Sequence, residues 1–203
     1  MKLYDSKAAP NPRRVRIFLA EKGIALPTEQ VDLAKLEQKN PGYSKINPLQ
    51  RIPALAFDDG EILCETVAIC RYFEEIQPEP PLFGVGAREK ARVEMWQRRA
   101  ELEFFYPVAM TFRHTHPAMK QMEQPQIAEY AETMRPRALA FARFLDSELA
   151  GRRYLAGESF SIADITALVA ADFTKPARIA LPDDLTNLAR WRAEVSSRPS
   201  ATA

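Results

Sequence analysis

The sequence of 203 residues predicts a small α/β domain followed by an all-helical domain. In the first eighty residues, strand-like and helix-like segments follow one another in the order βαβ and then ββα. Residues 77–86, QPEPPLFGVG, contain three prolines and two glycines, a composition typical of a linker. Beyond them, apolar residues recur only at helical spacing. We therefore predict domains at 1–78 and 88–203, joined by a linker at 79–87.

The βαβ half of the first domain begins with the strand KLYD at residues 2–5. A helix follows, in which Val15 and Phe18 lie at helical spacing before a stop at Gly23. TEQVDL, residues 28–33, is predicted as the second strand.

The ββα half lies behind a polar stretch, residues 34–47, in which no element is predicted. The segments ALAF (54–57) and EIL (61–63) flank the sequence DDG, which is a strong signal for a hairpin turn. A largely buried helix is predicted to start at Glu65. Strands and helices in this order favour a mixed sheet covered by helices.

The second domain is predicted to contain four helices. The first runs from residue 87 to about 115 and the second from 125 to 150, each with an apolar stripe. The third begins at Ser161, and the fourth spans about 185–197.

The segment FSIADI marks the start of the third of these helices. Ser161 suits the N-cap and Asp164 falls at the third helical position, which gives a capping box with aspartate in the place of glutamate. Phe160 and Ile165 are spaced as a hydrophobic staple. We interpret this segment as a folding motif and assign it no catalytic role.

The composition excludes several classes of protein. Twenty-eight basic and 27 acidic residues give a net charge of +1, which offers no electrostatic case for binding nucleic acid. With 46% hydrophobic and 27% charged residues, the chain has the composition of a soluble protein. No apolar run approaches the roughly 20 residues of a membrane helix, and no signal segment follows Met1. We expect a cytoplasmic protein that binds no membrane.

The cysteines and histidines predict neither a disulfide nor a metal site. Cys64 and Cys70 are six residues apart, not in a C-x-x-C pattern, and are expected to be buried as small apolar residues. His114 and His116 are two apart, so on one helix they face different directions and cannot form a simple metal pair.

Several motifs occur together in a characteristic order: RIPAL before the hairpin, CETVAI at the helix start, the proline-rich linker, and FSIADI. With them the chain resembles the glutathione S-transferase superfamily over essentially its whole length, in particular bacterial cytosolic-type members of the nu, theta and beta classes. The resemblance implies a thioredoxin-like domain that binds glutathione, a helical domain that binds an electrophilic co-substrate, and a homodimer. An exposed apolar stripe on the helix starting near Ala87 would fit such a dimer.

The resemblance assigns part of the glutathione site to two dipeptides. Ile52-Pro53 has a cis peptide bond in this family, and the Ile52 backbone pairs with the ligand like an added strand. The alternative is a proline that only starts an edge strand. Glu65-Thr66 suits the ammonium and carboxylate of the γ-glutamyl group. The alternative is a favourable acidic residue and an ordinary threonine cap at a helix start.

Four further residues lie where the resembling enzymes reach the glycine carboxylate of glutathione: Gln38, Lys39, Gln50 and Arg51. A carboxylate in a partly closed groove needs a cation, and Arg51 is favoured over Lys39 because it adjoins Ile52. The alternative is that both cations are ordinary solvated surface residues.

The stretch DSKAAPNPRR, residues 5–14, is predicted to hold the thiolate of glutathione at a helix start. The resemblance places Ala9 where related enzymes carry a Tyr, Ser or Cys donor, and alanine cannot donate a hydrogen bond. Asn11 is the favoured substitute, because nu-like members use an asparagine in this setting. Ser6, Arg13 and the backbone N–H groups of residues 10–12 are less favoured donors. The alternative reading makes Asn11 a helix cap with Pro12 at the first helical position.

The helix near residue 110 is predicted to line the electrophile pocket, with Tyr106, Phe112 and Arg113 as candidates and Phe105 beside them. Core packing is the competing explanation for the aromatic residues. The expected activity is conjugation of glutathione to a small hydrophobic electrophile, as in detoxification. The alternatives are a glutathione-dependent disulfide or peroxide reductase and a non-catalytic protein that binds partners.

Overall fold

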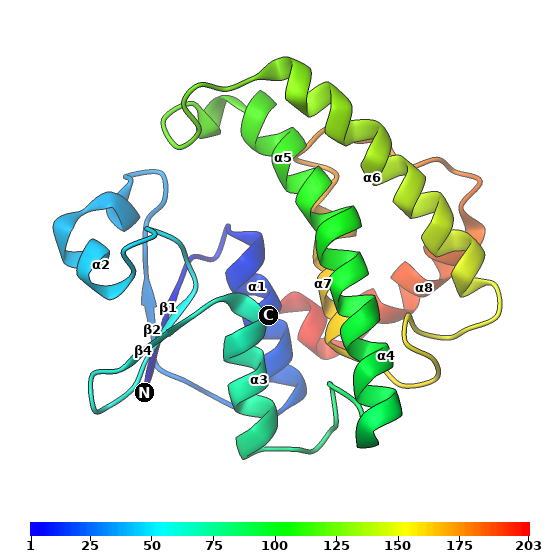
Figure 1. Ribbon diagram of the computed structural model, residues 1–203, viewed down its shortest axis with the longest axis horizontal. Coiled ribbons are helices and arrows are strands. Elements are labelled where there is room, and N and C mark those ends of the chain that lie inside the picture. The colour runs from blue at the N-terminus through cyan, green and yellow to red at the C-terminus, as the bar shows by residue number, and fades with distance from the viewer. The chain divides into compact units, whose positions relative to one another are not determined.

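The computed structural model describes residues 1–203, which divide into two compact units. The first comprises Met1–Pro81 and Thr202–Ala203, and the second comprises Leu82–Ala201 (Figure 1). The first is an α/β unit and the second is helical, so the predicted fold class is confirmed. No helix is both long enough and apolar enough to cross a membrane.

The α/β unit is built on a four-stranded mixed sheet with the strand order β2-β1-β3-β4. β1 pairs in parallel with β2 and antiparallel with β3, and β3 pairs antiparallel with β4. The strands and the two long helices of this unit are β1 (Lys2–Asp5), α1 (Pro10–Glu21), β2 (Thr28–Gln30), β3 (Ala54–Ala56), β4 (Ile62–Cys64) and α3 (Thr66–Ile76).

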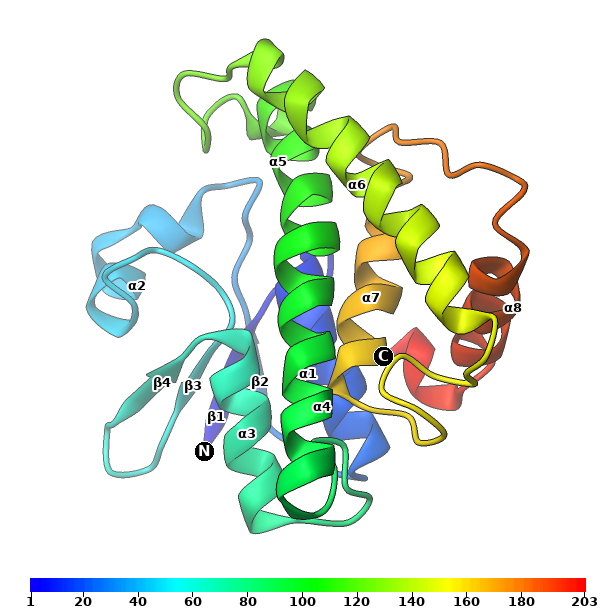
Figure 2. The same cartoon turned by 45° about the vertical axis from the view of Figure 1, so that its right-hand side comes forward.

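Helices cover both faces of this sheet. α1 and α3 lie side by side on one face, and α2 (Pro41–Ile46) lies on the other (Figures 1 and 2). Because side chains alternate along a strand, Leu3 and Leu55 point away from the face that carries Tyr4 and Ala54. Tyr4 and Ala54 pack in one cluster with Tyr43 of α2.

The helix α2 and the preceding turn η1 (Glu37–Lys39) lie in residues 34–47, where the sequence predicted only a polar stretch. A six-residue helix is too short to show an apolar period, because only Tyr43 and Ile46 face the sheet. The short helix is therefore a structural element that sequence periodicity missed.

A buried cation joins the ends of α1 and α3. Lys22, at the C-cap of α1, pairs with Glu74 at 2.5 Å, and its side chain is fully buried. Its ammonium also donates to the carbonyl oxygens of Gln77 at 2.8 Å and Pro80 at 2.5 Å. Because these acceptors lie at and beyond the end of α3, Lys22 fixes the chain where it leaves the α/β unit.

The helical unit begins with one continuous helical path through α4, the π-helical segment η2 and α5. α5 and α6 run alongside each other (Figure 2). Every residue of α7 from Ile162 to Ala171 is buried. The elements are α4 (Gly86–Arg99), η2 (Ala100–Phe105), α5 (Tyr106–Thr115), η3 (Pro117–Met119), α6 (Ala128–Leu149), α7 (Ile162–Phe173), α8 (Thr186–Ser196) and η4 (Pro199–Thr202).

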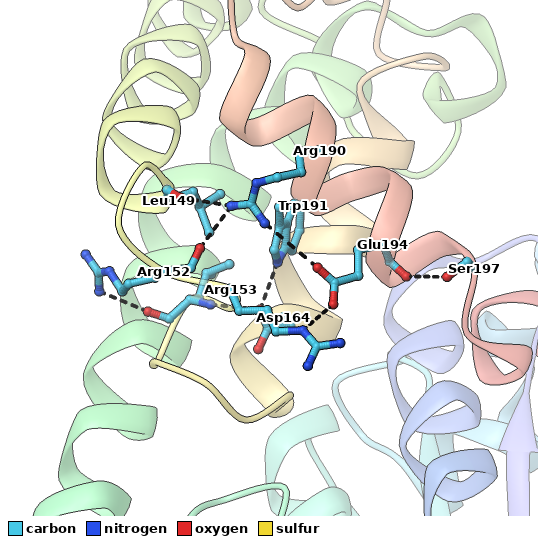
Figure 3. Close-up of polar contacts among 9 residues, drawn as sticks. Leu149, Arg152, Arg153, Asp164, Arg190, Trp191, Glu194 and Ser197 are labelled. Carbon is cyan, nitrogen blue, oxygen red and sulfur yellow. Dashed lines mark hydrogen bonds and ion pairs between the residues drawn. The ribbon is translucent and has the colours of Figure 1, made fainter.

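The predicted capping box at the start of α7 is present, and its aspartate has a wider role. Asp164 Oδ2 accepts hydrogen bonds from the backbone N–H and the hydroxyl of Ser161, both at 3.0 Å. Its Oδ1 accepts from the indole N–H of Trp191 (Figure 3) and from the Leu155 N–H, both at 2.9 Å. Burial raises the pKa of Asp164 to about 6, while these four hydrogen bonds oppose the rise.

Candidate functional site

The candidate site is built on one edge of the sheet. Tyr4, Ala54 and Cys64 lie in one row across β1, β3 and β4. β1 and β4 end at this edge and β3 begins there, because β3 runs antiparallel to both. The segments that adjoin the edge are residues 6–11, 52–53 and 65–66. Chain topology therefore gathers three of the predicted site segments.

The helix α1 starts at Pro10, with Ala9 as its N-cap in an extended conformation. Asn11 is then the second helical residue, so the alternative in which it caps the helix is wrong. The prediction of donors from residues 10–12 also needs correction, because Pro10 and Pro12 have no N–H. Of these three residues, only Asn11 has a backbone N–H to donate.

Asn11 carries two donor groups that make no hydrogen bond within the chain: its backbone N–H and its side-chain NH₂. The next N–H along the helix, that of Arg13, bonds to the Ala9 carbonyl at 3.3 Å. The Asn11 side-chain oxygen accepts from the buried Arg14 at 3.1 Å. Both donor groups of Asn11 are therefore available to a ligand at the start of α1, where the helix dipole favours an anion.

The loop before α1 is held by a buried carboxylate that the sequence did not single out. Arg16 donates to Asp5 Oδ1 at 2.6 Å, and Gln30 donates to Asp5 Oδ2 at 2.8 Å. Arg16 also donates to the Lys7 carbonyl at 3.2 Å. Ser6, one of the predicted donors, is buried within this loop. These bonds fix the backbone that leads to Ala9.

The peptide bond Ile52–Pro53 is cis, as the resemblance implied. The Ile52 N–H and C=O make no hydrogen bond within the chain, and both remain for a ligand. β3, which begins at Ala54, lies between β1 and β4, so the alternative of a proline starting an edge strand is wrong.

Two side chains from and beside α2 hold the residue before Ile52. The Tyr43 hydroxyl donates to the Arg51 carbonyl at 2.7 Å, and the Asn47 side-chain amide donates to the same oxygen at 2.8 Å. Both Tyr43 and Asn47 are buried, and burial raises the pKa of the Tyr43 hydroxyl. The helix missed in the sequence is thus what positions the Ile52 backbone.

Glu65 and Thr66 begin α3 in an unexpected arrangement. Glu65 is the N-cap, with φ at +71°, and Thr66 is the first helical residue. The alternative of an ordinary threonine cap is therefore wrong. A non-glycine residue at positive φ carries a backbone strain of about 1–3 kcal/mol. The exposed Glu65 carboxylate makes no bond within the chain, and Thr66 is buried.

The four residues predicted for the glycine carboxylate differ in their surroundings. Gln38 is buried and Lys39 is exposed, both on η1. The Gln50 amide donates to the Ser44 hydroxyl at 3.2 Å. Arg51 is exposed, and its guanidinium makes no hydrogen bond or ion pair within the chain. Arg51 is therefore a cation with its full donor set available to a ligand.

The residues predicted for the electrophile pocket lie along α5, and each of them contacts a different side chain. Tyr106 is 42% exposed, and its hydroxyl lies 3.1 Å from that of Tyr130. Phe112 stacks on His116 with ring centroids 4.5 Å apart. Arg113 donates to Glu123 at 2.5 Å, so its charge is already paired. The neighbouring Phe105 is a buried residue of the core.

The remaining candidates for chemistry are held by structural contacts. His114 Nδ1 accepts from the Ile127 N–H at 3.1 Å, and His116 Nδ1 accepts from the Ala118 N–H at 3.2 Å. No group of three or more His, Cys, Asp or Glu side chains is arranged to hold a metal ion. Cys70 is buried as predicted, whereas Cys64 is half-buried.

The comparisons with known proteins agree over nearly the whole chain. The family model described as "Glutathione S-transferase, N-terminal domain" matches residues 8–76, and "Glutathione S-transferase, C-terminal domain" matches 105–199. Glutathione S-transferase 2 of Saccharomyces cerevisiae is 35% identical, over 98% of this chain and 87% of the yeast protein. Glutathione S-transferase F11 of Arabidopsis thaliana is 29% identical, over 98% and 94% of the two chains.

A solved structure has the same fold at a comparable identity. The crystal structure of a glutathione S-transferase domain-containing protein from Marinobacter aquaeolei superposes with a TM-score of 0.95. It is 34% identical, and the match covers 98% of this chain and 99% of that chain.

Proposed function

Because the chain belongs to the glutathione S-transferase family, we propose that it conjugates the thiolate of glutathione to a small hydrophobic electrophile. The observation that carries the proposal is Asn11, which has two unused donors at the sheet edge next to the segments of Ile52 and Glu65. Glutathione supplies its own nucleophile, so the protein has only to favour the thiolate over the thiol.

The peptide part of glutathione binds to Ile52, Glu65 and Thr66 in this proposal. The free N–H and C=O of Ile52, before Pro53, pair with the ligand backbone as an added strand would. The Glu65 carboxylate pairs with the ligand ammonium, and the start of α3 at Thr66 receives the γ-glutamyl carboxylate.

The glycine carboxylate of glutathione is assigned to the group of Arg51, Gln50, Gln38 and Lys39. Arg51 is the main contact, because its exposed guanidinium has no partner in the chain. A guanidinium binds a carboxylate through two parallel hydrogen bonds, which a lysine cannot do.

The thiolate is assigned to Asn11, and Ser6 and Arg13 are the less favoured donors. A free thiol has a pKa of about 8.5, which hydrogen bonds to the charged form and a helix N-terminus both lower. Asn11 offers a side-chain NH₂ and a backbone N–H at that position. The side chain of Ala9 is a methyl group, which gives the glutathione sulfur no hydrogen-bond donor and does not clash with it.

The electrophile is assigned to α5, where Tyr106 and Phe112 present aromatic surface. Arg113 contributes through its pair with Glu123 and not as a free cation. A homodimer is also part of the proposal, supported by Met95 at 40% and Leu102 at 44% exposure on α4 and η2. We further propose a bacterial, cytoplasmic enzyme of detoxification, in keeping with two free cysteines and with the similarity to the Marinobacter protein.

Two measurements test this function. Calorimetric titration should detect glutathione binding, and no binding at millimolar ligand would exclude it. Conjugation to a generic aryl halide, measured at a pH below the pKa of the bound thiol, should then fall roughly tenfold or more in Asn11→Ala, because there each unit by which that pKa rises lowers the ionised fraction about tenfold. Turnover of a mixed disulfide without any conjugation would instead favour a glutathione-dependent reductase. Binding without either turnover would favour a non-catalytic protein.

A further inference from the structure

We propose that Arg14 is a positioning residue for the thiolate donor, because it sets the orientation of the Asn11 amide. Arg14 Nη1 donates to Asn11 Oδ1 at 3.1 Å, from one turn further along α1. Arg14 is 1% exposed, whereas Asn11 is half-buried at the start of the helix. The inference rests on the proposed function, since it concerns how Asn11 binds the sulfur of glutathione.

The hydrogen-bond chemistry of the two side chains allows one orientation of the amide. A guanidinium has only donors, so it requires an acceptor opposite Nη1. The Asn11 oxygen meets this requirement at 3.1 Å, whereas a flipped amide would place its NH₂ group against the guanidinium. The NH₂ group is therefore turned away from Arg14, and it makes no hydrogen bond within the chain.

The bond also makes the amide a better donor to an anion. A charged donor on the carbonyl oxygen polarises the amide and strengthens the hydrogen bonds that its N–H groups make. A solvated asparagine would flip freely and present its oxygen to the thiolate for part of the time, which would repel the charge. The buried Arg14 removes that second orientation at a position where Ala9 supplies no side-chain donor.

The sequence around these residues leaves the amide as the main donor of the first turn. Pro10 and Pro12 have no N–H, so two of the N–H groups that a helix start normally presents are missing. The Asn11 backbone N–H is the one that remains among residues 10–12. A correctly oriented side-chain NH₂ beside it gives the sulfur a second donor from the same residue.

A purely structural role for Arg14 predicts a different result from a positioning role. If Arg14 only stabilised α1, its removal would lower the free energy of unfolding and leave the pKa of the bound glutathione thiol unchanged. If it acts through Asn11, its removal must raise that thiol pKa, and only while Asn11 is present. A double-mutant cycle separates the two, because it measures the coupling between the residues.

The experiment measures the thiol pKa of bound glutathione by titrating thiolate absorbance in four proteins: wild type, Asn11→Ala, Arg14→Met and the double variant. We expect Asn11→Ala and Arg14→Met each to raise the pKa by about one unit. Arg14→Met should cause no further rise in the Asn11→Ala background. Lys22→Met is the matched control, because it removes another buried cation, at the C-cap of α1 and about 16 Å along the helix from Asn11. It should leave the thiol pKa unchanged.

The outcomes that overturn the inference differ from those that overturn the function. An equal pKa rise from Arg14→Met with and without Asn11, or no rise, contradicts the positioning role while the enzyme remains a transferase. Absence of glutathione binding by the wild type contradicts the function itself. If Arg14→Met does not fold, a neutron crystal structure of the wild type decides. If the neutron structure places the Asn11 side-chain oxygen towards Arg14, the inference is supported. If it places the deuterated NH₂ group towards Arg14, the inference is overturned.

Discussion

The indole N–H of Trp191 donates to Asp164 Oδ1 at 2.9 Å, and both side chains are fully buried. This bond joins α8 to the start of α7 (Figure 3), while the other contacts of Asp164 reach Ser161 and Leu155. One carboxylate therefore ties a helix start, a loop and a second helix together. Because all four contacts are donors, the ionised carboxylate, which only accepts, satisfies every one of them.

Replacing this carboxylate by an amide should destabilise the protein although it removes a buried charge. In Asp164→Asn, an NH₂ group faces N–H or O–H donors and leaves them without an acceptor. Each unsatisfied buried donor costs about 1–3 kcal/mol, so we expect a loss of about 3 kcal/mol in urea unfolding. The control is Asp184→Asn, in an exposed pair with Arg143, which should change stability by less than about 0.5 kcal/mol. Equal losses in both variants would contradict the prediction.

The same residue should make stability depend on pH in a specific window. In the folded chain Asp164 takes up a proton near pH 6, whereas in the unfolded chain it does so near its usual value of 3.8. Between these values the folded state binds more protons, so its free energy of unfolding falls as the pH rises. The stability difference between wild type and Asp164→Asn should therefore be largest near pH 4 and shrink towards pH 6. A constant difference across this window would show that burial does not raise the pKa.

The buried pair at the end of α1 should contribute far more than a surface pair. Lys22→Met removes a fully buried ammonium together with its bonds to Glu74 and to the Gln77 and Pro80 carbonyls, and breaking a buried pair typically costs about 3–5 kcal/mol. Lys2→Met is the matched control, because Lys2 pairs with Glu29 at 2.6 Å but both side chains are exposed. It should cost at most about 1 kcal/mol. Urea unfolding of both variants measures the contrast, and similar losses would refute it.

Sequence patterns predicted the strands and long helices because each has a clear period or a terminal signal. The hairpin followed from the DDG turn, and the start of α7 followed from the Ser161 and Asp164 spacing. α2 was not predicted, because a six-residue helix with two apolar contacts is too short to show a helical period. Its position depends on packing against Ala54 and against Tyr4, of which Tyr4 is distant in sequence.

The site was predicted as a set of residues but not as a set of contacts. The spacing of RIPAL and CETVAI indicated Ile52 and Glu65, while the bonds that hold the loops were not visible. In the sequence, Arg14 is one of three arginines in the segment PNPRRVR, and only its burial in the structure distinguishes it from the other two. The absence of N–H groups at Pro10 and Pro12, in contrast, was readable from the sequence and corrects the expectation of backbone donors there.

The hydroxyl of Tyr43 should affect glutathione affinity from outside the site. Tyr43→Phe removes one of two donors to the Arg51 carbonyl and loosens the residue before Ile52. We expect a loss of about 1 kcal/mol in stability and a several-fold rise in the dissociation constant for glutathione. Tyr72→Phe is the control, because that hydroxyl contacts only the Met1 sulfur at 3.6 Å. Unchanged affinity in Tyr43→Phe would show that Asn47 alone holds the loop.

Removal of the Arg51 guanidinium should weaken glutathione binding without slowing the bound enzyme. The residue is exposed and unpaired, so its contact with a carboxylate is a charge pair largely open to solvent. Such a contact supports binding of substrate and transition state alike, and therefore acts on KM and not on kcat. We expect Arg51→Ala to raise the dissociation constant for glutathione by about tenfold at low ionic strength.

Salt separates this charge pair from other causes of weaker binding. At 1 M salt the screening length is about 3 Å, so the difference between wild type and Arg51→Ala should shrink markedly. Lys45→Ala is the control, because it removes an exposed cation of α2 that we place outside the site. Its affinity for glutathione should match the wild type at both salt concentrations. If Lys45→Ala and Arg51→Ala weaken binding equally, the general positive charge of this surface binds the carboxylate, and Arg51 has no specific contact with it.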